Sequence, residues 1–130
     1  MEHKHFKGKV YYEAEMERLR EEYRKWKVLT QKINTPFFII YNDFKEEHLE
    51  DISGGALKLY LYLGFHSKNY TGESWHSVDA IAGYFGRDKR TIKGWFKELE
   101  ERKLIKRIQR GFKWKANTFL LPYGKDKQEG

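Results

Sequence analysis

The residues of this sequence best suited to chemistry are the lysines and arginines between Gly86 and Lys115. This window holds twelve Lys or Arg and four Asp or Glu, a net charge of +8, whereas the whole chain carries +7. Ammonium and guanidinium groups donate hydrogen bonds to phosphate oxygens and to guanine O6 and N7. A solvated helix surface would normally intersperse acids, but residues 87–97 contain only Asp88. The pattern therefore favours a polyanionic partner.

Enzymatic arrangements are much weaker in the sequence. The chain has no cysteine, which excludes disulfides, thiolate ligands and thiol nucleophiles. Its five histidines lack metal-ligand spacing, and neither a P-loop nor a nucleophile elbow is present. Glu73 and Asp79 near His76 could imitate an acid–base pair, but a helix start and a solvated loop explain them better. We expect no enzymatic activity, no cofactor and no metal.

The basic residues around position 90 are predicted to lie on a helix that Asp88 caps. Its apolar face is expected to consist of Ile92, Trp95, Phe96 and Leu99, with Trp95 at the edge of the core. At 100° per residue, the opposite surface carries Lys89, Arg90, Lys93, Gly94 and Lys97. A glycine inside a helix costs about 1 kcal/mol relative to alanine. Gly94 would thus reflect either close approach to a duplex or drift.

A second helix is predicted just before this one. Ser77 can cap it, and Gly86 can end it. Its apolar positions are Val78, Ile81, Ala82 and Phe85. Two capped amphipathic helices joined by a short turn with a glycine predict a helix-turn-helix.

Further elements are expected on both sides of these helices. Residues 56–65 alternate like a strand but also fit a buried helix, and we favour a helix because Ser53 can cap it. The run "FFIIY", residues 37–41, is predicted to be a strand. The runs "LIKRIQ" and "KWKANTFLL" predict a basic hairpin around Arg110, Gly111 and Phe112. A basic hairpin directly after such a helix is a wing.

The N-terminal segment forms a separate pattern. The first ten residues resemble a polar, frayed tail, and a helix is predicted from Tyr11 to about Leu29. Its apolar stripe consists of Tyr12, Met16, Leu19, Tyr23 and Trp26. This stripe must pack on its own domain or on its twin in a second chain. Tyr and Trp are poor coiled-coil core residues, so we favour a mixed role of bracing the domain and contributing to a homodimer.

The segment "SVDAIAGYFGRDKRTIKGWFKELEERKLIKR" resembles the helix-turn-helix of winged-helix DNA-binding proteins. With the preceding "DISGGALKLYLYLGFHSKNYTGESWHS", it is similar to the helix-turn-helix domains of plasmid and phage replication initiators and of some small transcription regulators. The resemblance covers roughly residues 37–121. Two positions depart from the pattern: Asp88 replaces the usual Ser cap, and Lys103 replaces a glycine that commonly precedes "LI". The helix must therefore end without a residue that easily adopts the left-handed conformation.

These patterns predict a mainly α protein with a small antiparallel β-sheet (α+β), a winged helix-turn-helix preceded by an N-terminal amphipathic helix. The expected domains are the tail and helix at 1–36, the DNA-binding domain at 37–123 and a polar tail at 124–130. A cytoplasmic location is expected, because the sequence has no apolar signal region and no run long enough to span a bilayer. No small-molecule effector is evident.

The expected function is sequence-specific binding of double-stranded DNA, with the recognition helix at about 89–102 in the major groove and the basic wing at about 105–120 on the backbone. Two biological roles are supported about equally by the sequence: regulation of transcription, and replication or partition of a mobile element. The alternative is a non-enzymatic protein-interaction adaptor, and RNA binding lacks the usual signatures. The candidate DNA contacts are Ser77, Arg87, Lys89, Arg90, Thr91, Lys93, Gly94, Lys97, Lys106, Arg107, Arg110, Lys113 and Lys115.

Overall fold

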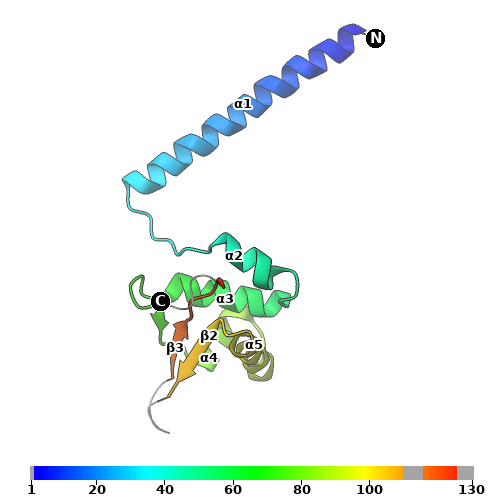
Figure 1. Ribbon diagram of the computed structural model, residues 1–130. Coiled ribbons are helices and arrows are strands. Elements are labelled where there is room, and N and C mark those ends of the chain that lie inside the picture. The colour runs from blue at the N-terminus through cyan, green and yellow to red at the C-terminus, as the bar shows by residue number, and fades with distance from the viewer. Residues whose placement is uncertain (1, 110–115, 126–130) are drawn as a thin grey trace. The chain divides into compact units, whose positions relative to one another are not determined.

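The computed structural model describes residues 2–109 and 116–125, and the chain divides into two compact units, Met1–Phe37 and Phe38–Gly130. The first unit contains helix α1 (Glu2–Lys32). The second contains, in chain order, α2 (Asn42–Phe44), the π-helical turn η1 (Lys45–Leu49), α3 (Gly54–His66), β1 (Glu73–Ser74), α4 (Val78–Phe85), α5 (Lys89–Glu101), β2 (Ile105–Ile108) and β3 (Asn117–Leu120) (Figure 1).

Helix α1 is longer than the sequence predicted. It begins at Glu2, so the prediction of a frayed tail over the first ten residues was wrong. Only Gly8 disfavours a helix there, and one glycine costs about 1 kcal/mol, which the surrounding helix formers can offset. The helix ends at Lys32, three residues after the predicted end near Leu29. Asn34 adopts a positive φ of 55°, and the Thr35 amide donates to the Thr30 carbonyl at 2.9 Å, as in a left-handed helix end.

Three helices and a small sheet enclose the core of the second unit. Residues 54–66 form a helix, as predicted, and the Ser53 hydroxyl accepts a hydrogen bond from the Ala56 amide at 3.1 Å. The fully buried side chains include Leu59, Leu63, Ile81, Ile92, Leu99 and Leu104. Gly55 brings α3 against α5, because an added Cβ would lie 2.0 Å from Nε1 of Trp95. The core therefore fixes α5 directly against α3.

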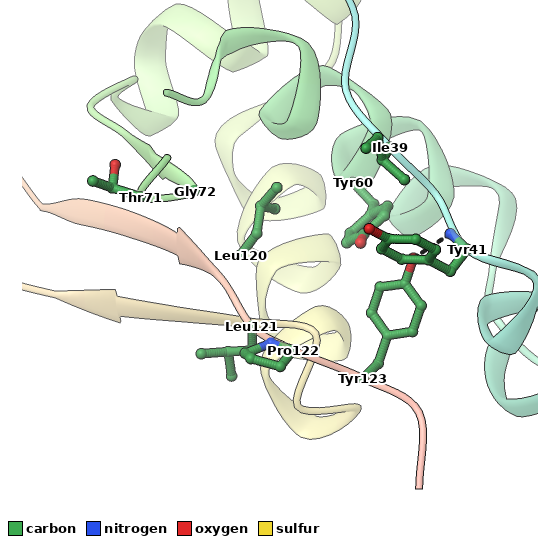
Figure 2. Close-up of a pocket in the computed structure, with 9 residues that line it drawn as sticks. All are labelled: Ile39, Tyr41, Tyr60, Thr71, Gly72, Leu120, Leu121, Pro122 and Tyr123. Atoms are coloured by element: carbon green, nitrogen blue, oxygen red, sulfur yellow. Dashed lines mark hydrogen bonds between the residues drawn. The ribbon is translucent and has the colours of Figure 1, made fainter. Parts of the chain in front are cut away.

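The prediction of a strand at residues 37–41 was wrong. This segment has no regular secondary structure. Phe38 packs against the core of the second unit, whereas Ile39, Ile40 and Tyr41 are 41–55% exposed. An added Cβ at Gly64 would lie 2.3 Å from the Phe38 ring. The Tyr41 amide donates to the Tyr123 hydroxyl at 2.7 Å (Figure 2). The cavity of about 510 Å³ drawn there is lined by Ile39, Tyr41, Tyr60, Thr71, Gly72, Leu120, Leu121, Pro122 and Tyr123.

The third strand is β1, which sequence reasoning missed because it is only two residues long. The sheet has the order β1-β3-β2 and is antiparallel throughout. Glu73 pairs with Phe119 on one side, and Ile105 pairs with Leu120 on the other. The hairpin between β2 and β3 is thus confirmed, and its connecting residues 110–115 lie outside the described part. The fold is mainly α with a small antiparallel sheet, a winged helix.

Within the described residues, no helix has both the length and the hydropathy that crossing a bilayer requires.

Candidate nucleic-acid interface

Local hydrogen bonds set the ends of α4 and α5, as the sequence predicted. The Ser77 hydroxyl accepts from the Ala80 amide at 3.0 Å, and a carboxylate oxygen of Asp88 accepts from the Thr91 amide at 2.8 Å. Gly86 ends α4 with a φ of +64°, which a side chain would disfavour. The turn between the two helices is therefore short and well defined.

Asp88 remains ionised in this position. Hydrogen bonds from Thr91 hold the pKa of its carboxyl below the usual range, and the charges of Arg90 and Arg87 act in the same direction. An aspartate thus replaces serine as the cap while two arginines beside it offset its negative charge. The departure from the usual cap leaves the helix start intact.

Helix α5 separates an apolar face from a basic one. Ile92, Phe96 and Leu99 are at most 2% exposed, and Trp95 is half-buried at the edge of the core, as predicted. The exposed residues of the opposite surface are Lys89, Arg90, Lys93, Gly94 and Lys97. At Gly94, an added Cβ would meet nothing within 4 Å. Packing inside the protein therefore does not require this glycine.

Two polar contacts orient α5 against its neighbours. Glu98 accepts a hydrogen bond from the Ser53 amide at 2.7 Å, and this bond holds the pKa of its carboxyl below the usual range. The contact ties the C-terminal part of α5 to the start of α3. At the other end, Lys89 pairs with Asp79 of α4 at 2.8 Å. Of the basic surface, Lys89 therefore already has an acidic partner within the protein.

A cleft of about 540 Å³ runs between α5 and β2. It is lined by Lys93, Phe96, Lys97, Glu100, Glu101 and Arg107. The guanidinium carbon of Arg107 lies 4.2 Å from the centre of the Phe96 ring. Burial lowers the pKa of Arg107, which the charge of Glu100 opposes, and arginine stays protonated in proteins. Its Nε is buried, with no hydrogen-bond partner in the described part of the protein. This cation is held in place before any ligand arrives.

The two basic residues of β2, Lys106 and Arg107, lie on different faces of the sheet. Ile105 is buried and Arg107 half-buried, whereas Lys106 and Ile108 are exposed. Successive side chains of a strand point to opposite faces. Arg107 therefore joins Lys93 at the cleft, and Lys106 lies on the other face. Both were predicted to contact the DNA backbone from the wing, and the twofold period of a strand could have separated their two faces in the sequence.

The remaining candidate contacts have mixed positions. Ser77 and Arg87 are exposed around the turn, and Thr91 is half-buried. The wing residues Arg110, Lys113 and Lys115 lie outside the described residues. The stripe residues of α1 are exposed, apart from the half-buried Met16: Tyr12, Leu19, Tyr23 and Trp26.

An aromatic cluster that sequence reasoning missed positions the start of α4. The rings of His66 and His76 have centroids 4.4 Å apart, and Tyr62 lies 5.3 Å from His76. Burial lowers the pKa of His76, and the neighbouring His66 adds to the effect. Because these residues have no periodic spacing, the contact could not be predicted from their positions in the chain. The cluster anchors the residue directly before Ser77 on α3.

Comparison with known families agrees with this geometry. Residues 50–105 match a family model described as a helix-turn-helix domain. This segment runs from the turn before α3 to the first residue of β2. No match was found among curated proteins or among solved structures.

Proposed function

We propose that this chain, which contains a helix-turn-helix domain, binds double-stranded DNA in a sequence-specific manner. The observation that carries the proposal is the division of α5 into two faces. One face is buried in the core, and the other exposes Arg90, Lys93 and Lys97 around a glycine with open space above it. Such a helix can lie in a major groove with its basic side chains at the base edges and phosphates.

The wing would supply contacts to the backbone. Arg107 is the best-ordered candidate, because its stacking on Phe96 fixes a cation at the edge of the cleft beside α5. An ordered side chain loses less conformational entropy when it binds a phosphate. Lys106, Arg110, Lys113 and Lys115 would add sequence-independent attraction. Ser77, Arg87, Lys89 and Thr91 would contact the backbone around the turn.

We propose that the protein acts in the cytoplasm. Its proposed role is that of a transcriptional regulator or of a replication or partition factor of a mobile element. We further propose that the chain acts as a homodimer, with the α1 stripe contributing to the contact. A dimer would place two recognition helices on successive major grooves about 34 Å apart. The DNA beside its gene distinguishes the roles: an inverted repeat at a promoter favours regulation, and an array of direct repeats favours an origin or partition site.

The two open helical glycines provide the sharpest test of the recognition surface. At both Gly94 in α5 and Gly83 in α4, an added Cβ would meet nothing within 4 Å. Each change to alanine should stabilise the fold by about 0.5–1 kcal/mol. Only Gly94→Ala should weaken binding to a cognate duplex selected from a random pool, by roughly tenfold, because the added methyl group would occupy the space in which the helix backbone approaches the bases.

Both variants are compared by thermal unfolding and by fluorescence anisotropy with the cognate duplex and a scrambled one. Equal cognate affinity of Gly94→Ala and Gly83→Ala would mean that α5 does not approach the bases at position 94. Arg90→Ala and Lys93→Ala should narrow the gap between cognate and scrambled DNA. If both retain full discrimination, α5 is not the reading element.

Salt dependence tests DNA binding itself against the adaptor role. If about six cations neutralise phosphates, the logarithm of the binding constant should fall against the logarithm of the salt concentration with a slope near −5. A slope near zero would contradict the proposal. Replacing Arg107 with Ala should weaken binding to the cognate duplex and to the scrambled duplex about equally.

A further inference from the structure

Helix α1 carries an apolar stripe that is exposed along most of its length. Tyr12, Leu19, Tyr23 and Trp26 are between 48% and 63% exposed. With Met16, they recur at alternating spacings of four and three, the pattern of the core positions of a coiled coil. The stripe alone does not identify the partner, but the charged residues beside it do.

The flanks of the stripe carry opposite charges. Glu15 and Glu22 directly precede core positions, and Arg18 binds both of them, Glu22 at 2.5 Å, which holds the two carboxylates on one flank. On the other flank, Arg20 and Lys27 directly follow core positions. One edge of the stripe is therefore acidic over these two turns, and the other edge is basic.

In a parallel, in-register pair, a residue that precedes a core position on one chain lies beside the residue of the second chain whose number is five higher. Glu15 then meets Arg20 of the second copy, and Glu22 meets Lys27. Symmetry repeats each pair, so all of these contacts are attractive.

Antiparallel pairs lose this match. In two antiparallel registers, the stripe residues of both helices still pack against one another. In one of them, Glu15 lies beside Glu22 of the second copy, and in the other, Glu22 lies beside Glu22 of the second copy. Glu13, which follows Tyr12 on the other flank, attracts a basic residue of the second copy, and this attraction only offsets the repulsion between the glutamates. The charge pattern therefore selects the parallel arrangement.

We propose that two copies of this chain pair through α1 as a parallel, in-register coiled coil. The inference rests on the proposed homodimer and adds its surface, orientation and register. In this arrangement, both helix-turn-helix domains follow the same end of the coiled coil, where they can reach successive major grooves about 34 Å apart. Antiparallel helices would direct them to opposite ends, about 45 Å apart for a 31-residue helix.

Single cysteines test the orientation cleanly, because the natural chain has none. Tyr12→Cys and Trp26→Cys place thiols at the two ends of the stripe. Ala14→Cys and Val28→Cys are matched controls, two residues away on the opposite side of the helix. In the full-length protein at tens of micromolar without DNA, a short bismaleimide should link each stripe variant to itself roughly ten times faster than its control.

Sedimentation of the same proteins completes the test. Only a parallel pair brings position 12 to position 12 and position 26 to position 26. A dimer whose stripe variants link no faster than the controls would overturn the parallel arrangement. A monomer at tens of micromolar would overturn the pairing itself.

Charge exchange tests whether the charged flanks of the two copies meet. The variant Glu15→Lys with Glu22→Lys and the variant Arg20→Glu with Lys27→Glu should each self-associate about tenfold more weakly or worse. A mixture of the two should form heterodimers as readily as the natural chain forms homodimers. Loss of helix structure would not be rescued by the second variant, so failure of the mixture to associate would contradict the contact between the charged flanks of the two copies.

These outcomes are separate from DNA binding. Cross-linking and sedimentation are measured without DNA, so they stand whether or not α5 reads a sequence. Conversely, a steep salt slope with a monomeric protein would retain the DNA-binding proposal and overturn this one.

Discussion

Helices α1 and α5 have similar sequence patterns and different kinds of support. Both place apolar residues at spacings of three and four among dense charges. In α5, Ile92 and Leu99 are fully buried against other helices. In α1, the corresponding stripe is exposed, and the supporting contacts are local ion pairs such as Arg18 with Glu15 and Glu22.

The difference teaches what periodicity can and cannot predict. A repeating apolar pattern identifies the face that avoids water, but it does not say what covers that face. The face of α5 is covered by its own domain, so this helix should unfold together with the core. In the proposed coiled coil, the face of α1 is covered by a second copy, so its stability should depend on local pairs and on concentration.

Two leucines give the largest expected contrast. Leu99→Ala leaves a cavity at a fully buried site and should lower the free energy of unfolding by about 2.7–5 kcal/mol. Leu19→Ala, at a site that is 48% exposed, should lower it by less than about 0.5 kcal/mol in dilute protein. Urea unfolding measured by tryptophan fluorescence compares them. Similar losses for both variants would show that α1 belongs to the same cooperative core.

Two glutamates extend the comparison to polar contacts. Glu98 accepts the Ser53 amide across two helices, whereas Glu22 contacts Arg18 on its own helix. Glu98→Gln should lower the free energy of unfolding by about 1 kcal/mol at neutral pH, since the charged acceptor of the Ser53 amide becomes a neutral one. Glu22→Gln should cost only about 0.2–0.5 kcal/mol.

The pH dependence gives the sign of the Glu98 contribution. The pKa of this carboxyl is lowered in the folded protein, mainly by the hydrogen bond from the Ser53 amide. Its stabilisation is therefore complete above the ordinary carboxyl range, near pH 4.3, and is lost as the pH falls through the lowered value. The stability difference between the natural chain and Glu98→Gln should shrink below about pH 4. A difference that stays constant down to pH 2 would contradict this assignment.

Much of the second unit could be predicted from sequence because its signals are local. Caps at Ser53, Ser77 and Asp88 and the glycine at position 86 define helix ends without reference to distant residues. Four-residue strands with an alternating pattern predict a hairpin in the same way. The helix-turn-helix and its basic surface follow from these signals.

Other features depend on contacts between distant residues. The run at 37–41 has strand propensity, but Phe38 packs beside Gly64 and Tyr41 bonds to Tyr123. The stacking of Arg107 on Phe96 appears only once β2 lies beside α5. Tertiary contacts thus decided the cases in which propensity failed.

The ends of the two helices give a smaller effect. Lys103 after α5 and Asn34 after α1 are the non-glycine residues with positive φ among the described positions, at 59° and 55°. Lys103→Gly should raise the free energy of unfolding by about 0.5–1 kcal/mol, because lysine is strained there. Asn34→Gly should change it by less than about 0.3 kcal/mol, because asparagine tolerates this conformation. Thermal unfolding measures both, and a destabilising Lys103→Gly would contradict the strain at this position.

The smallest effect tests whether α1 rests on its local ion pairs. Arg18→Gln removes the pairs with Glu15 and Glu22, while glutamine keeps a similar helix propensity. Lys97→Gln is the matched change in α5, where the distance to Glu101 is 4.0 Å. Amide hydrogen exchange should accelerate about two- to fivefold in the middle of α1 for the first variant. It should stay unchanged in α5 for the second, because buried contacts hold that helix.

About 1 M salt should abolish the effect in α1, since screening then acts over roughly 3 Å. An unchanged exchange rate in α1 at low salt would mean that a partner, and not the local pairs, already holds this helix.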